Sequence, residues 1–126
     1  MNNDFVYYNN NPYGIKEEDC VTRAITLASQ NFNYFEIARK LELVAELLDC
    51  EKLCVCCYDF LIEKVLMFPR IDIDIGMTVR DFAEQHQRGI YLLRMDGHIT
   101  TLIDGKLYDL WDASNKEITH VWFCGY

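Results

Sequence analysis

Several features are missing from the sequence, and each absence narrows the class of protein. No apolar run approaches the roughly 20 residues of a membrane-spanning helix, and the first residues carry neither the basic start nor the apolar stretch of a secretion signal. Positive charge is scarce: 12 Lys and Arg stand against 20 Asp and Glu, a formal net charge of −8. We therefore expect a cytoplasmic protein that binds no membrane and no nucleic acid, because its acidic field repels phosphate backbones.

The spacing expected of a complete zinc site is also missing, although the chain has 6 cysteines. A cluster is formed by Cys50, Cys54, Cys56 and Cys57. No second Cys or His pair follows this cluster at the usual distance. Thiols are favoured over disulfides without a secretion signal, and cysteine packs well as a small hydrophobe. The prediction is therefore buried structural thiols, with no metal and no other cofactor.

The composition is that of one ordinary globular domain, since 51% of the 126 residues are hydrophobic and 25% are charged. Helical patterns come first and strand patterns last. This order predicts an α+β fold, with N-terminal helices packed on a small C-terminal antiparallel β-sheet. We expect a single domain over residues 1–126. It comprises an N-terminal arm and loop (1–18), a helical part (19–66), and a short helix followed by antiparallel sheet (67–126).

Helix signals divide the first two thirds of the chain. Asp19 is a suitable N-cap, so a first helix is expected from residue 20, with a buried stripe of apolar residues. Apolar residues at helical spacing predict a second helix over 34–48, and a third is expected over 57–65. Thr78 and Asp81 resemble a capping box at the start of a further short helix.

The dipeptide Asp104-Gly105 lies between two runs of β-branched, aromatic and aliphatic residues. It accepts the positive φ angles of a type I′ turn and so predicts a β-hairpin. The resulting register pairs Ile103 with Lys106, Thr101 with Tyr108, Thr100 with Asp109 and His98 with Trp111. Because side chains alternate along a strand, His98 and Asp109 share one face and lie diagonally across from each other.

A histidine beside an acid is half of a catalytic apparatus. Asp109 can hold one ring nitrogen of His98 and leave the other free to act as a base. Cys20 is a candidate nucleophile, since the first turn of a helix favours the thiolate. Asp112 competes with Asp109 for the role of orienting acid, because a bulge near Trp111 would bring Asp112 to the histidine instead.

Other conspicuous side chains receive structural interpretations. We expect Arg23 to form a buried or interfacial ion pair. Asp72 and Asp74 are expected to be solvated residues of an edge strand, since the spacing of a calcium loop is absent. His120 lies in an ordinary strand, with no assigned role. Trp111 has two readings: packing in the core, or shielding of a Cys–His pair from water.

Short motifs carry a resemblance to a known family. They are Asn11-Pro12-x-Gly14, Asp19-Cys20-x-x-Arg23-Ala24, Gly97-His98-x-Thr100 and Tyr108-Asp109-x-Trp111-Asp112. In this order they resemble a group of small papain-like cysteine peptidases found in bacteria and their phages. The resemblance implies a papain-like fold, with Cys20 as nucleophile, His98 as base and an Asp of the hairpin as the third member.

The resemblance also implies an oxyanion hole, formed by the Cys20 backbone N–H and a side-chain amide upstream of it. Papain-like enzymes commonly use a Gln a few residues before the cysteine, and this chain has none there. Asn11 is the best substitute, followed by Asn10 and Asn9.

The leading hypothesis is therefore a thiol hydrolase that cuts a peptide or isopeptide bond in a polypeptide substrate. The second hypothesis is a related transglutaminase or deamidase that uses the same residues. The third is a papain-like fold without activity that serves as a protein-binding module.

Overall fold

A computed structural model describes residues 5–15 and 19–126, so residues 1–4 and 16–18 of the predicted arm and loop lie outside the described residues. The chain forms a mixed α+β fold. In order, its elements are β1 (Phe5–Tyr7), α1 (Cys20–Ser29), α2 (Tyr34–Leu48), α3 (Val55–Phe60), a π-helix η1 (Leu61–Val65), β2 (Arg70–Ile71), α4 (Val79–Gln85), β3 (Ile90–Met95), β4 (His98–Ile103), β5 (Lys106–Asp109) and β6 (Ile118–Gly125).

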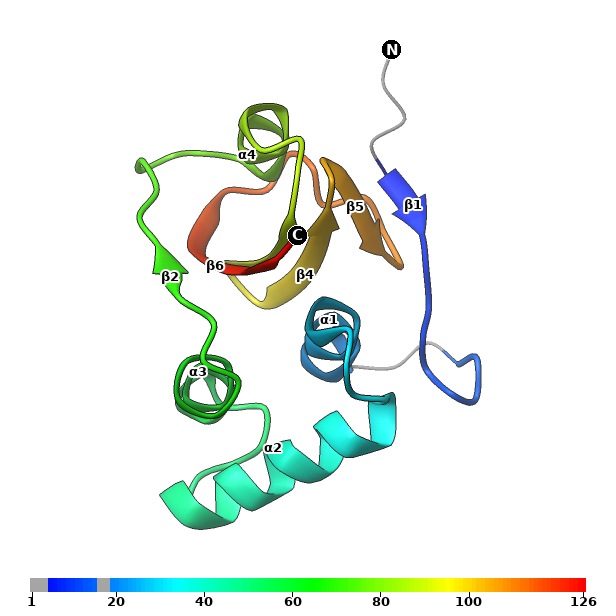
Figure 1. The fold of residues 1–126 in the computed structure, drawn as a ribbon, viewed down its shortest axis with the longest axis vertical. Helices are drawn as coiled ribbons and strands as arrows, with labels where there is room; N and C mark the ends of the chain where they lie inside the picture. Colours follow the sequence, from blue (N-terminus) through cyan, green and yellow to red (C-terminus); the bar gives the residue numbers. More distant parts are fainter. Residues whose placement is uncertain (1–4, 16–18) are drawn as a thin grey trace.

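The sheet has six strands in the order β1-β5-β4-β3-β6-β2. Every residue of β3 is buried, as expected of a central strand covered on both faces. The predicted antiparallel pairing is correct for β2 to β6. It is wrong for the sheet as a whole, because β1 pairs with β5 in parallel and makes the sheet mixed (Figure 1). The pairing of β1 depends on a distant partner strand, which local sequence does not specify.

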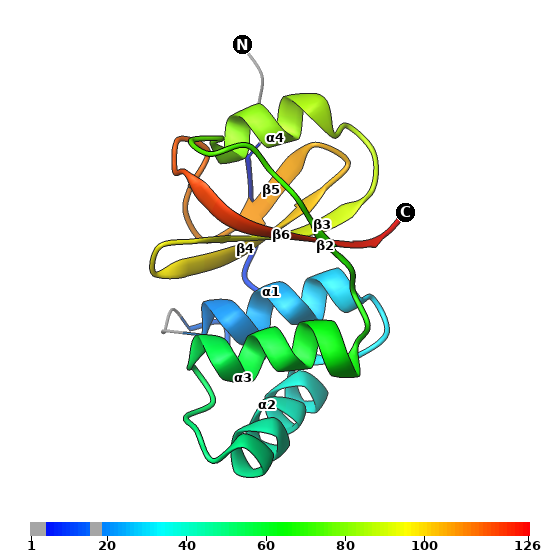
Figure 2. The same ribbon diagram turned by 90° about the vertical axis from the view of Figure 1, so that its left-hand side faces the viewer.

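Helices cover both faces of the sheet, and each face has its own hydrophobic core. Figure 2 shows α4 above the sheet, α1 and α3 below it, and α2 as a further layer beneath them. Large fully buried side chains on the side of α1 to α3 include Ile25, Leu41, Leu61, Leu92 and Trp122. On the side of α4 they include Val79, Phe82, Leu93, Leu102 and Val121.

The predicted hairpin is confirmed. Asp104 and Gly105 have φ angles of 49° and 78°, as a type I′ turn requires. The strands pair Thr101 with Tyr108, and the two neighbouring pairs toward the turn follow in the predicted register. The β4–β5 ladder ends at the Thr101–Tyr108 pair, short of the predicted pairs Thr100–Asp109 and His98–Trp111. The start of β4 and the end of β5 therefore lie side by side, at the end of the hairpin opposite the turn.

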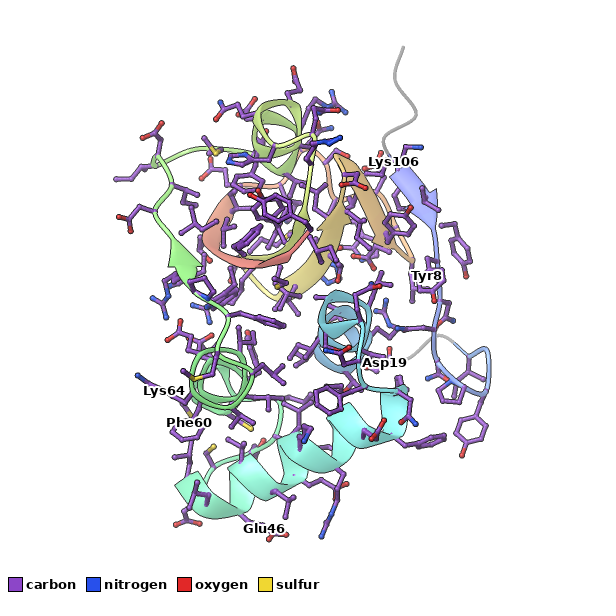
Figure 3. All side chains as sticks on the ribbon, viewed as in Figure 1. Tyr8, Asp19, Glu46, Phe60, Lys64 and Lys106 are labelled. Atoms are coloured by element: carbon purple, nitrogen blue, oxygen red, sulfur yellow. The ribbon has the colours of Figure 1, made fainter. Side chains whose placement is uncertain are left out.

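Helix starts are confirmed in three cases and corrected in one. α1 begins at Cys20, and α2 begins with a capping box at Asn33. α4 begins with the capping box predicted at Thr78. The third helix begins at Val55, earlier than predicted, and continues as the π-helix. The outer side of α2 is solvated, as Glu46 illustrates (Figure 3).

The interpretation of Asp72 and Asp74 concerns the edge of the sheet. β2 is a short edge strand, and Asp72 and Asp74, just beyond it, are exposed as expected. Within the part of the chain that the structure describes, no helix combines the length and the apolar character needed to cross a membrane.

Candidate active site

The topology brings the ends of three elements together. Cys20 is the first residue of α1, His98 is the first residue of β4, and Asp109 is the last residue of β5. α1 is fastened across β4 by a buried hydrogen bond, in which Thr101 Oγ1 donates to the Ala24 carbonyl oxygen at 2.8 Å. This contact brings the start of α1 to the end of the hairpin that carries His98 and Asp109.

His98 and Asp109 form a short buried contact. The His98 Nε2 lies 2.6 Å from the Asp109 Oδ2, and the two side chains are only 8% and 2% exposed. Burial disfavours a charged ring, but the hydrogen bonds to Asp109 and Cys20 outweigh it and raise the pKa of His98 to about 9. Burial likewise raises the pKa of the Asp109 carboxyl, but His98 outweighs it and the net pKa is lowered. At neutral pH the pair is therefore an imidazolium and a carboxylate.

Cys20 completes the arrangement on the other side of the ring. Burial raises the pKa of the Cys20 thiol, but the hydrogen bond with His98 and a backbone hydrogen bond from Ile99 outweigh it, so the net pKa is lowered. Because Nε2 of His98 is bound to Asp109, Nδ1 is the nitrogen left for the sulfur. The site thus favours a thiolate beside an imidazolium, and Ile99 supplies a donor that sequence reasoning missed.

A buried arginine, Arg23, binds the carboxylate of Asp109. Arg23 Nε donates to Asp19 Oδ1 at 2.6 Å, and Arg23 Nη1 donates to Asp109 Oδ1 at 3.3 Å. Arg23 is only 8% exposed, so the predicted ion pair is confirmed, with two partners instead of one. The guanidinium fixes Asp109 from the side opposite His98. It thereby ties the start of α1 to the hairpin.

Asp19 stands at the N-cap position of α1 but makes no side-chain cap hydrogen bond. Its carboxylate instead binds Arg23, and the Tyr34 hydroxyl donates to Oδ2 at 2.8 Å. Figure 3 shows Asp19 between α1 and the beginning of α2. Burial raises the pKa of this carboxyl, but its hydrogen-bond partners outweigh that effect and the net pKa is lowered.

The structure places Asn11 next to Asp19. Its Nδ2 donates to Asp19 Oδ2 at 2.9 Å, and its Oδ1 accepts from the Tyr13 backbone N–H at 2.8 Å. Asn10 donates to the Arg23 carbonyl oxygen, and Asn9 donates to that of Ile15. The Asn10 and Asn11 amides hold the loop against the start of α1, and the Asn9 amide bonds within the loop. Asn11 is not among the described residues that line the groove beside Cys20. Its role in oxyanion binding stays a prediction.

Asp109, and not Asp112, is the acid that the structure brings to His98. Asp112 is exposed, and its Oδ1 accepts from the backbone N–H and the hydroxyl of Ser114. Trp111 is 43% exposed, and its ring lies 4.8 Å from the His98 ring at an angle of 39°. The core-packing interpretation of Trp111 is therefore wrong, and the indole covers the imidazole from the solvent side.

Cys20 and His98 open onto a groove of about 950 Å³, within the ~300–1,000 Å³ typical of ligand sites. Its apolar lining comes partly from Leu53 and Val55, ahead of and at the start of α3, and from Trp111 on the hairpin side. A groove of this volume and lining is able to hold an organic ligand beside the Cys20 sulfur.

The groove also has a polar part that sequence reasoning missed. Arg94 Nη1 donates to Asp59 Oδ1 at 2.5 Å, and its guanidinium lies 2.8 Å from His120 Nδ1. Arg94, His120 and Tyr58 all line the groove. Burial and the nearby arginines lower the pKa of His120, so this ring is neutral at pH 7. The signal that could have found this contact is the strand register, which sets Arg94 opposite His120. Using it requires knowing that β3 pairs with β6.

All 6 cysteines are thiols. Within the cluster only Cys57 is buried, while Cys50 and Cys54 are half-buried and Cys56 is exposed. The expectation of buried structural thiols is therefore wrong for most of the cluster, because Cys50 and Cys54 lie in the segment before α3 and Cys56 lies exposed in its first turn. No group of three or more His, Cys, Asp or Glu in residues 5–15 and 19–126 is arranged to hold a metal ion.

Comparison of the chain with protein-family models, with curated proteins and with solved structures gives no significant match.

Proposed function

We propose that this protein is a papain-like cysteine hydrolase that cleaves a peptide or isopeptide bond in a polypeptide substrate. The observation that carries the proposal is the pair of contacts that joins Cys20 to His98 and His98 to Asp109, at the edge of an open groove. A nucleophile, a base in hydrogen-bond contact with it and an acid that orients the base are the components of thiol-dependent acyl transfer.

The chemistry follows from the protonation states of these groups. The Cys20 thiolate attacks the substrate carbonyl carbon while the imidazolium of His98 remains bound to Asp109. His98 then gives its proton to the leaving amine, and the acyl group stays on the sulfur as a thioester. The neutral ring next takes a proton from water, which attacks the thioester and frees the carboxylate product.

The backbone N–H groups at the start of α1 are candidate donors for the oxyanion. The first helical hydrogen bond runs from Arg23 N to the Asp19 carbonyl oxygen, so the N–H of Cys20 precedes it. The Asp19 side chain is turned toward Arg23 and does not cap this helix end. We assign the first oxyanion donor to the Cys20 N–H.

The first test is the reactivity of Cys20 toward iodoacetamide, measured by mass spectrometry on the tryptic peptide 17–23, which contains no other cysteine. We expect fast alkylation at pH 7 in the wild-type chain and slow alkylation in His98→Ala. Reduced glutathione, added to the same samples as a reference thiol, is the control, and its alkylation rate stays unchanged. If Cys20 reacts no faster than an ordinary thiol, or equally fast without His98, the proposal is wrong.

The second test identifies the reaction. A tryptic peptide mixture from a bacterial lysate is incubated with the wild-type protein or with Cys20→Ala, in isotopically labelled water. New peptide termini that carry the label only with the wild type support hydrolysis. Release of ammonia from Gln without new termini selects the deamidase, and Gln–Lys crosslinks select the transglutaminase. A reactive Cys20 with no product of any kind contradicts the hydrolase proposal and favours the binding module.

A further inference from the structure

The Cys54 and Cys56 sulfurs lie 2.9 Å apart, away from the Cys20 site. This separation exceeds the ~2.05 Å length of a disulfide bond by less than about 1 Å. Cys54 is the N-cap of α3, with an extended backbone at φ −70° and ψ 141°, and Cys56 is in the first turn of the helix. The Cys57 N–H donates to the Cys54 carbonyl oxygen at 3.0 Å and closes the turn that faces the two sulfurs toward each other.

We propose that Cys54 and Cys56 are a redox pair that closes to an intramolecular disulfide in exchange with a small-molecule disulfide of the glutathione class. The pair is accessible, because Cys56 is exposed and Cys54 is half-buried at the surface. The proposal does not depend on the chemistry assigned to Cys20.

The exchange has two steps that balance. The Cys54 thiolate attacks one sulfur of oxidised glutathione, forms a mixed disulfide and releases one glutathione thiolate. Cys56 then loses its proton and attacks the Cys54 sulfur, which closes the protein disulfide and releases the second glutathione. In sum, two protein thiols are oxidised to one disulfide, and one glutathione disulfide is reduced to two thiols.

The electrostatics of the pair support this order of attack. The hydrogen bond from Cys56 lowers the pKa of Cys54, whereas the same bond and Cys50 raise the pKa of Cys56 to about 12. Cys54 is therefore the thiolate that attacks first. Once Cys54 is a mixed disulfide, its negative charge is gone and the main cause of the high pKa of Cys56 is removed.

The other cysteines are less suited to this exchange. Cys57 is 0% exposed, and its thiol donates to the Leu41 carbonyl oxygen at 3.4 Å. Burial raises the pKa of Cys124 to about 12, which keeps it a thiol. Cys50 is half-buried and contacts the thiols of Cys56 and Cys57 from the preceding turn. It is therefore the nearest competing partner, and the experiment has to separate it.

The disulfide would form a small ring around Val55, the residue between the two cysteines. The Val55 side chain is 47% exposed and lines the groove that opens beside Cys20. Oxidation would thus fix the backbone of one wall of that groove, whatever ligand the groove holds.

The test treats the whole reduced protein with oxidised glutathione, blocks the remaining thiols with iodoacetamide and maps tryptic peptides without reduction. Peptide 53–64 carries Cys54, Cys56 and Cys57, and Cys50 falls in peptide 41–52. We expect peptide 53–64 to lose two hydrogen atoms, with fragmentation placing the bond between Cys54 and Cys56 and a single blocked thiol at Cys57. Dithiothreitol reverses the change.

Cys56→Ser is the informative variant, since its side chain is at the surface and the substitution is nearly isosteric. We expect it to lose the internal bond and to accumulate a glutathione adduct on Cys54. Cys57→Ser keeps the bond, and circular dichroism checks that its buried site still folds. The proposal is overturned if peptide 53–64 stays fully alkylated, if the bond links it to peptide 41–52, or if Cys56→Ser still forms an internal disulfide.

Discussion

Replacing Asp109 with Asn removes one charge from the candidate site and keeps the shape of the side chain. His98 has its pKa raised from 6.5 to about 9, and the hydrogen bond to Asp109 is the largest of the effects that raise it. At ~1.36 kcal/mol per pKa unit, this rise corresponds to about 3 kcal/mol in favour of the charged ring. A hydrogen bond to a charged group contributes about 1.5–3 kcal/mol. The equilibrium constant that favours the thiolate–imidazolium pair over the neutral pair should therefore fall about 10- to 100-fold.

The assay is the rate of iodoacetamide alkylation of Cys20 as a function of pH. In the wild-type chain we expect Cys20 to react at pH values below the ordinary thiol pKa of 9.0, because its net pKa is lowered. The ion pair is lost as the pH rises through about 9, where His98 loses its proton. In Asp109→Asn the rise in rate moves to higher pH, toward that of an unassisted thiol.

Asp112→Asn is the matched control, since Asp112 is exposed and bound to Ser114. It should alkylate like the wild type at every pH. Thermal unfolding of both variants shows whether the fold survives. The reasoning fails if Asp109→Asn retains the wild-type rate across the pH range, or if Asp112→Asn causes the larger loss. Either result would show that Asp109 does not raise the pKa of the His98 imidazole.

Three further predictions concern stability. Arg23→Met should reduce the free energy of unfolding in urea by about 3–5 kcal/mol, because two buried carboxylates lose their cation. Arg39→Met at an exposed ion pair should cost less than about 1 kcal/mol, and equal losses would show that the Arg23 network contributes no more than a surface pair. The two carboxylates bound by Arg23 have lowered pKa values, so their contribution is present above pH 3.8 and is lost as the pH falls through the folded-state values. The raised pKa of His98 stabilises the fold fully below pH 6.5, and this contribution is lost as the pH rises through about 9. The urea midpoint should therefore be highest between these two ranges and should fall toward acid and toward alkaline pH. A midpoint that does not change with pH would contradict the ion pairs. Gly105→Ala should cost about 1–2 kcal/mol in urea titrations, since Gly105 has a φ of 78° and a Cβ there would meet the Gln87 side chain at 2.9 Å; an unchanged midpoint would show that the turn tolerates a side chain.

The hairpin could be predicted because the information is local. The turn chemistry of Asp104-Gly105 fixes the register near the turn, and extending this register predicts that His98 and Asp109 share one face, where the structure has them in contact. Similarly, the apolar periodicity and capping residues of the helices are short-range signals that packing did not override. These signals are sufficient to predict the juxtaposition of His98 and Asp109 from the sequence.

The remaining features depend on contacts between distant segments. Asp19 has a high N-cap propensity, but in the buried setting a charged partner in Arg23 outcompetes the backbone N–H groups. The Arg94–His120 contact exists only because β6 pairs with β3, and the sequence gives no local sign of that neighbour. The turn that faces Cys54 toward Cys56 likewise depends on where α3 begins, a boundary that was misplaced by two residues, from 57 to Val55.

The hairpin that carries His98 and Asp109 is made long after the helix that carries Cys20. While the chain is being synthesised, Cys20 therefore emerges as an unassisted thiol, with neither His98 nor Asp109 in existence. It acquires its partners only once β4 and β5 have joined the sheet and α1 has docked across β4. In a growing or partly unfolded chain Cys20 therefore has only the reactivity of an ordinary thiol, and a faster reaction of this sulfur reports that α1 and the hairpin have already met.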